Sequence, residues 1–196
     1  MPYDAAKAVA FATAPSGRYR DGECWTLMED AVVGNGGTSS KKLTPNFSAA
    51  ASFVWGDVVA VANLKPGDVL QFTGYDWQRH VRTEVTMPPN SDRNGRDSMV
   101  DFQQTRGEPQ HSAMVVSVVS AGIVNVVEQN IPPILGDVQT FQLVLIPRPM
   151  TEVTTRETIT YTDAGDPEKK KISGDIVTKV TTTETVSHPP RCYRPK

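Results

Sequence analysis

The chain has 196 residues, of which 38% are hydrophobic and 21% charged, and its net charge at pH 7 is -2. This length allows one sizeable hydrophobic core and at most a small extension. The weak negative charge gives no electrostatic reason to expect a nucleic-acid partner. No run of apolar residues is long enough to predict a membrane span.

The N-terminal segment lacks the pattern of a secretory signal peptide. Asp4 stands where basic residues are expected, and Lys7 interrupts the apolar run. We therefore expect the chain to be cytoplasmic at synthesis, while its final location is unknown. A phage-borne enzyme, or an effector delivered by a specialised secretion system, would need no such signal.

Helices are predicted in the first part of the chain. Residues 4–13 are rich in alanine and predict a short helix. A second helix is predicted from residue 24, because apolar side chains recur with helical spacing on one face. These residues are Cys24, Leu27, Met28, Ala31 and Val32. Residues 38–46 predict a loop, and the Ala-rich segment 47–55 predicts a further short helix.

Strands are predicted further along the chain. The turn residues at 64–68 lead into a strand at 69–72. Residues 111–119 and 123–128 predict two paired strands, and 140–146 predict another. The segment 76–110 is polar and contains several prolines and glycines, so we expect an inserted loop or lid there.

The C-terminal region has a different composition from the rest. Residues 151–162 and 175–187 are rich in threonine and alternate in β-branched side chains, which predicts a long β-hairpin. We expect the hairpin, residues 151–187, to dock on the main domain or on a protein partner. The predicted domains are therefore a main domain at 1–149 and, at 150–196, the hairpin extension with a Pro-rich tail.

The chain has only two cysteines and three histidines, with no spacing typical of metal ligands. We expect no metal and no cofactor. A cysteine in the first turn of a helix, as predicted for Cys24, has its thiolate favoured by the helix dipole. The alternative interpretation is that Cys24 is a small core residue on the apolar face of the helix.

The predicted hairpin around residues 120–123 contains a candidate base, His111. If its loop has an even number of residues, His111 lies opposite Pro132, and Glu128 and Asn130 share the face of His111. An odd-numbered loop without a bulge would place them on opposite faces. In the first case His111 would have two candidate groups to orient its imidazole.

Several short motifs together resemble the CHAP family, which is related to the NlpC proteins. They are Gly22-Glu23-Cys24-Trp25, Trp55-Gly56, Lys65-Pro66-Gly67-Asp68-Val69-Leu70-Gln71-Phe72, His111-Ser112-Ala113-Met114-Val115-Val116 and Val127-Glu128-Gln129-Asn130. The resemblance implies an α+β, papain-like fold in which N-terminal helices pack on an antiparallel β-sheet. It also implies a catalytic set of Cys24 as nucleophile and His111 as base, with Glu128 and Asn130 completing the site.

The same resemblance implies a cysteine amidase or endopeptidase that cleaves an amide bond, with peptidoglycan or a peptide as substrate. Glu23 departs from the family, in which glutamine often precedes the cysteine, and its carboxylate would oppose a thiolate unless it points outward. Tyr75, Trp77 and His80 are candidate substrate-binding residues on the predicted lid. Two other functions remain open: a non-catalytic module that binds a peptide or partner, and a cysteine acyltransferase.

Overall fold

The structure is a computed structural model, and it describes residues 2–48 and 51–196. The chain divides into two compact units. The first unit contains the chain up to Trp77, together with Gln104–Pro147 and Val186–Lys196. The second unit contains Gln78–Gln103 and Arg148–Thr185.

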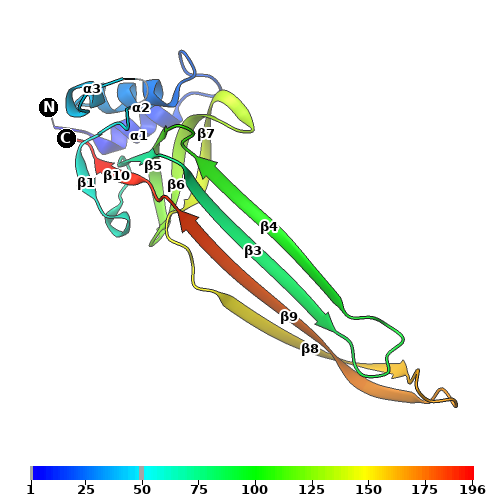
Figure 1. Ribbon diagram of the computed structural model, residues 1–196. Coiled ribbons are helices and arrows are strands. Elements are labelled where there is room, and N and C mark those ends of the chain that lie inside the picture. Colours follow the sequence, from blue (N-terminus) through cyan, green and yellow to red (C-terminus); the bar gives the residue numbers. More distant parts are fainter. Residues whose placement is uncertain (1, 49–50) are drawn as a thin grey trace. The chain divides into compact units, whose positions relative to one another are not determined.

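The helices of the described chain all belong to the first unit (Figure 1). They are α1 (Ala5–Thr13), α2 (Cys24–Val33), α3 (Ser40–Leu43) and the 3-10 helix η1 (Val61–Asn63). Helix α1 begins at Asp4, whose carboxylate accepts a hydrogen bond from the Lys7 N–H at 3.1 Å. Helices α1 and α2 pack on each other and on the central strands of a sheet.

That sheet has six strands in the order β1-β10-β2-β5-β6-β7. Their bounds are β1 (Asp57–Val59), β10 (Arg191–Arg194), β2 (Val69–Phe72), β5 (His111–Ser120), β6 (Ile123–Ile131) and β7 (Ile134–Val144). Neighbouring strands are antiparallel. Strand β10 lies between β1 and β2, so residues far along the chain supply an internal strand of the sheet.

Side chains of this sheet alternate between two hydrophobic clusters, one on each face. Val69 and Met114 pack with apolar residues of α1 and α2. Their neighbours Leu70 and Ala113 belong to the other cluster, which includes Phe72 and the start of β3. The alternation in β2 and β5 therefore anchors the helices to one face of the sheet.

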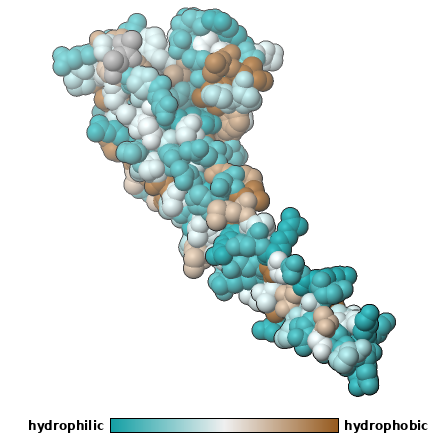
Figure 2. Space-filling model, turned by 45° about the vertical axis from the view of Figure 1, so that its right-hand side comes forward, coloured by the Kyte–Doolittle hydropathy of each residue, from teal (hydrophilic) through white to brown (hydrophobic). Residues whose placement is uncertain are grey.

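The second unit is built from long strands in a four-stranded sheet of order β4-β3-β9-β8. Their bounds are β3 (Tyr75–Thr86), β4 (Arg96–Arg106), β8 (Thr151–Thr162) and β9 (Lys171–Ser187), so three of them begin or end in the first unit. Ion pairs such as Arg82–Asp97 and Lys179–Glu152 line its exposed surface. Figure 2 shows a mostly hydrophilic surface along these strands, with scattered hydrophobic side chains.

The predicted α+β, papain-like CHAP fold is wrong. Of the residues that the structure describes, 49% are in strands and 13% in helices, and the strands form two sheets. Much of the difference lies in residues 76–110, for which the sequence predicts a loop or lid. Their polar side chains alternate on exposed strands, so that most of this segment forms β3 and β4.

Other local predictions also need correction. The Pro-rich tail contains β10, in which Cys192 and Tyr193 are buried. The Thr-rich segments pair as β8 and β9, but β9 also joins β3, so the hairpin is half of a sheet and not a separate extension. Helix α3 lies in the predicted loop at 38–46. The predicted helix at 47–55 falls partly outside the described residues, and 51–55 are not helical.

Gly107 connects β4 to the segment that leads into β5, and it offers a test of this connection. Its φ is +87°, and a Cβ there would lie 2.8 Å from the Phe72 backbone. Gly107→Ala should therefore lower the free energy of unfolding by about 2 kcal/mol or more, through backbone strain and a steric clash. Chemical denaturation followed by tryptophan fluorescence measures this loss.

Gly74→Ala is the matched control. Gly74 donates its N–H to the Gly107 carbonyl and also has a positive φ, of +68°, but a Cβ there meets nothing within 4 Å. Only the backbone strain of about 1 kcal/mol remains. Equal losses in the two variants would contradict the close approach of Gly107 to β2.

Candidate active site

The start of α2 places Cys24 as the first residue of the helix. Glu23 precedes it in an extended conformation, with no side-chain cap of its own. Asp21 links the residues on either side of Cys24, because its carboxylate accepts hydrogen bonds from the Glu23 N–H at 3.1 Å and from the Thr26 hydroxyl at 2.8 Å. Cys24 is partly exposed, while Leu27, Met28, Ala31 and Val32 further along α2 are buried.

His111 connects Cys24 to Glu128. Its Nε2 lies 2.8 Å from the Oε2 atom of Glu128, and its imidazole also hydrogen-bonds with the Cys24 side chain. Because Nε2 is engaged by the carboxylate, Nδ1 is the nitrogen left to face the sulfur. The structure therefore brings together a thiol, an imidazole and a carboxylate, in the order that nucleophilic catalysis by cysteine requires.

The charges in this group favour a protonated imidazole. Burial disfavours the imidazolium, but hydrogen bonds and charge from Cys24 and Glu128 outweigh burial and raise the pKa of His111 to about 9. Burial would also raise the pKa of Glu128, yet hydrogen bonds from His111 and Arg106 hold it below its ordinary value. An imidazolium beside the sulfur is the partner that a thiolate needs.

The register of the hairpin explains why Glu128 reaches His111. Two register shifts occur along β5 and β6, between Val115 and Ser117 and between Val118 and Ser120. Each one-residue shift reverses the face of the strand, and two shifts restore it. Ala113 therefore pairs with Glu128, which shares its face with His111. The expected pairing of His111 with Pro132 is not found.

Asn130 makes a contact other than the expected one with His111. A further register shift between Gln129 and Ile131 leaves it with a positive φ of +67°, so the alternation of β6 breaks at this residue. Its side-chain amide donates to the Glu23 carboxylate at 3.3 Å. This contact also accounts for the exposed Glu23, whose carboxylate is turned toward Asn130.

Arg106, the last residue of β4, belongs to the site although it is not among the residues predicted from the sequence. Its guanidinium donates to both carboxylate oxygens of Glu128, with distances between 2.7 and 3.1 Å, and it stacks on the Phe141 ring at 5.4 Å. The Arg106 side chain is 8% exposed and that of Glu128 is 0% exposed. The polar segment 76–110 predicts a loop, so the signal for Arg106 in the sequence is its closeness to His111.

A cavity of about 380 Å³ opens beside Cys24. Aromatic side chains and one cation form much of its wall, namely Trp25, Phe47, Phe53 and Lys41. Trp25 is held by its indole N–H, which donates to the Ser40 hydroxyl at 2.9 Å, and that hydroxyl donates to the buried Glu29. The Lys41 ammonium lies 4.9 Å from the centre of the Trp25 ring. A substrate group could enter next to the sulfur here.

The predicted substrate-binding residues lie elsewhere. Tyr75 is buried and donates its hydroxyl to the Val144 carbonyl at 2.8 Å, and Trp77 packs in the same hydrophobic cluster. His80 belongs to the second unit, where its Nδ1 lies 2.7 Å from the Asp101 carboxylate. None of the three lines the cavity at Cys24.

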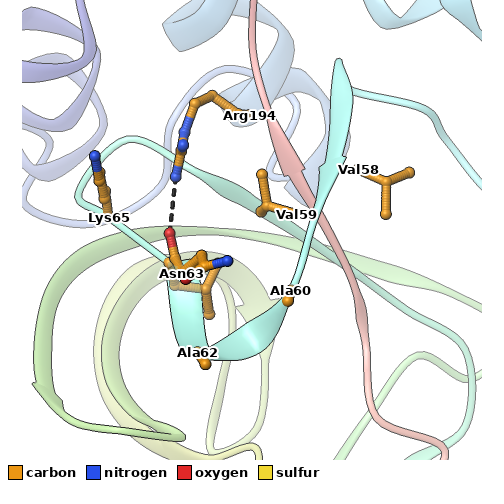
Figure 3. Close-up of a pocket in the computed structure, with 8 residues that line it drawn as sticks. Val58, Val59, Ala60, Ala62, Asn63, Lys65 and Arg194 are labelled. Atoms are coloured by element: carbon orange, nitrogen blue, oxygen red, sulfur yellow. Dashed lines mark hydrogen bonds between the residues drawn. The ribbon is translucent and has the colours of Figure 1, made fainter.

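Another cavity of the first unit, about 490 Å³ in volume, lies between η1 and the strands β1 and β10 (Figure 3). Arg194 reaches across it to the Asn63 carbonyl at 2.9 Å and pairs with Asp68. The remaining lining residues are mostly small or apolar, together with Lys65. No nucleophile and base meet there, so it offers no comparable chemistry.

Within the described residues, no group of three or more His, Cys, Asp or Glu side chains is arranged to hold a metal ion. No helix of that part of the chain is long and apolar enough to cross a membrane.

Comparisons with protein-family models, curated proteins and solved structures find no match. The contacts of Cys24, His111 and Glu128 are therefore the basis for the chemistry of the site.

The two cysteines should differ strongly in reactivity. Cys192 is 3% exposed, and burial together with the charge of Asp68 raises its pKa to about 12, so it has almost no thiolate at neutral pH. Cys24 is partly exposed and faces an imidazolium. We expect the native protein to take up one iodoacetamide label at pH 7, and peptide mass spectrometry should place that label on Cys24.

Cys192→Ala is the matched control and should label as the wild type does, whereas Cys24→Ala should remain unlabelled until the protein is denatured. Comparable labelling of both cysteines in the native protein would contradict the proposed environment of Cys24.

The raised pKa of His111 also predicts a pH-dependent stability. His111 binds a proton more tightly in the folded chain, because its pKa rises from 6.5 to about 9. The resulting stabilisation is fully present below pH 6.5 and is lost as the pH rises through 9. Relative to His111→Gln, the wild type should lose about 3 kcal/mol of unfolding free energy across this window.

Urea titrations between pH 6 and 9.5 measure this difference. Tryptophan fluorescence is a suitable signal, because Trp25, Trp55 and Trp77 all belong to the first unit. Glu128→Gln removes one of the two groups that favour the imidazolium and should weaken the pH dependence. Parallel stability curves for wild type and His111→Gln would contradict the proton affinity assigned to His111.

Proposed function

We propose that the protein is a cysteine hydrolase that cleaves an amide bond. One observation carries the proposal: His111 joins the side chain of Cys24, at the start of α2, to the buried carboxylate of Glu128. A core cysteine requires no such partners. The imidazolium–carboxylate pair supports a thiolate, while the neighbouring cavity supplies room for a substrate group.

In the proposed reaction, the Cys24 thiolate attacks the carbonyl carbon of the amide. The oxygen becomes negatively charged, and the Cys24 N–H is a suitable donor to it, because the first N–H groups of a helix have no partner within the helix. Collapse of the intermediate breaks the C–N bond while His111 protonates the leaving amine. A thioester to Cys24 remains.

Water completes the cycle. Neutral His111 takes a proton from water as the oxygen attacks the thioester, and the carboxylic acid product leaves as the thiolate forms again. Glu128 holds the imidazole through Nε2 in both half-reactions, so that Nδ1 keeps facing the sulfur. Asn130 is not assigned this orienting role, because its amide is engaged with Glu23.

We propose peptidoglycan as the first substrate to examine. The support is the ordered set of short motifs that resembles the CHAP family, in which peptidoglycan amidases and endopeptidases are common; it rests on these motifs and not on the overall fold, which differs. The aromatic cavity at Cys24 is compatible with a sugar or a peptide side chain beside the scissile bond.

Digestion of purified peptidoglycan tests the proposal. Wild type should release fragments with a new amino group and a new carboxyl group, and mass spectrometry identifies the bond that is cut. Cys24→Ala should lower the rate by at least about 10³-fold, and His111→Ala by a similar factor, because each removes a partner of the same step. Cys192→Ala should retain wild-type activity.

The same assay separates the other functions. Addition of an amine such as glycinamide should give an amide product if the protein is an acyltransferase, and only the free acid if it is a hydrolase. Binding of peptidoglycan by wild type and Cys24→Ala alike, without any cleavage, would instead indicate a non-catalytic module and would overturn the proposed activity.

A further inference from the structure

Arg106 is the one cation that contacts Glu128 besides His111, among the residues that the structure describes. Its guanidinium is almost fully buried and meets the carboxylate with two nitrogens, Nε and NH2. Such two-point contacts fix the plane of a carboxylate as well as its position. Oε2 of Glu128 therefore contacts His111, while both carboxylate oxygens also accept hydrogen bonds from Arg106.

We propose that Arg106 is a positioning residue, which holds Glu128 against His111 and balances the charge of the site when Cys24 ionises. The inference rests on the proposed function for its catalytic meaning. The arrangement of charges is a property of the folded chain and can be measured without any substrate.

Ionisable groups on several elements lie around His111. Cys24 comes from α2, Glu128 from β6 and Arg106 from β4, and the phenol of Tyr75 on β3 lies close enough to Arg106 and Glu128 to interact electrostatically with them. With a thiolate and an imidazolium present, Arg106 and Glu128 make the buried group neutral. Without Arg106, ionisation of Cys24 leaves one uncompensated negative charge away from water.

A buried uncompensated charge is strongly disfavoured. Replacing Arg106 with neutral glutamine should therefore make Cys24 ionise at a higher pH. It should also make His111 release its proton at a higher pH, because the Glu128 carboxylate would have no other cation. The acidic limb of the pH–activity profile, set by Cys24, and the alkaline limb, set by His111, should therefore both shift to higher pH. A merely structural loss of activity would not produce this joint shift.

The rate of alkylation of Cys24 by iodoacetamide, measured from pH 4 to 10 in the full-length protein, tests the proposal. Arg106→Gln should raise the midpoint of this profile by about one pH unit, so that the thiolate fraction falls about tenfold at a fixed pH below the midpoint. Arg106→Lys keeps the charge and should return the midpoint to within about 0.3 of the wild-type value.

Arg82→Gln is the matched control, because Arg82 also pairs with a carboxylate, Asp97, but is exposed and belongs to the second unit. It should leave the midpoint unchanged. If Arg106→Gln does not fold, the double variant Arg106→Gln/Glu128→Gln, which leaves no unpaired charge, is compared with Glu128→Gln alone. The midpoint should be higher in the double variant.

An unchanged midpoint in folded Arg106→Gln, or equal midpoints in the second comparison, would overturn the role of Arg106. Failure of the proposed function is a separate outcome. A shifted alkylation profile with no cleavage of any amide would support the role of Arg106 and contradict the proposed hydrolase activity. Cleavage of peptidoglycan by the wild type, with no shift of the alkylation midpoint in Arg106→Gln, would support the hydrolase activity and contradict this role of Arg106.

Discussion

The buried carboxylate of Glu128 is the constraint on which the rest of the candidate site depends. A carboxylate with no exposed surface is stable only if hydrogen bonds and opposite charges replace the water that it has lost. His111 and Arg106 supply these contacts from β5 and β4, while Glu128 itself lies on β6. Three strands must therefore be in place before the imidazole has a fixed direction.

The hydrophobic core positions the residues of the candidate site from both faces of β5. The face of β5 that carries His111 continues through Ala113 into the cluster with Leu70 and Phe72, and the Phe72 ring packs 6.0 Å from the imidazole. The opposite face holds α2 through Met114. Packing on both faces thus fixes the distance between the start of α2 and the first residue of β5.

Local patterns were sufficient for part of this structure. Helical spacing from Cys24 and the strands around residues 120–123 were visible in the sequence, and they brought Cys24, His111 and Glu128 into one hypothesis. The role of Asn130 was not predictable from alternation, because a register shift at that residue turns its side chain toward Glu23. Arg106 was hidden by the exposed, polar character of β4, which resembles a loop when no partner strand is known.

The fold class was wrong for a related reason. Long exposed strands in the second unit bury little apolar surface, and in β4 the side chains are so polar that composition alone does not separate the strand from a loop. Pairing over many residues, as between Thr151–Thr162 and Lys171–Ser187, stabilises them instead. The pairing of β9 with β3, by contrast, joins segments far apart in the chain, and local sequence does not reveal it.

The position of β10 has a consequence for the order of events during synthesis. Residues 191–194 pair with both β1 and β2, and β2 in turn pairs with β5, which begins at His111. A nascent chain that has already exposed Cys24, His111 and Glu128 still lacks an internal strand of the sheet that supports them. Cys24 is thus made early, but the sheet that supports His111 and Glu128 is complete only once residues 191–194 have been made.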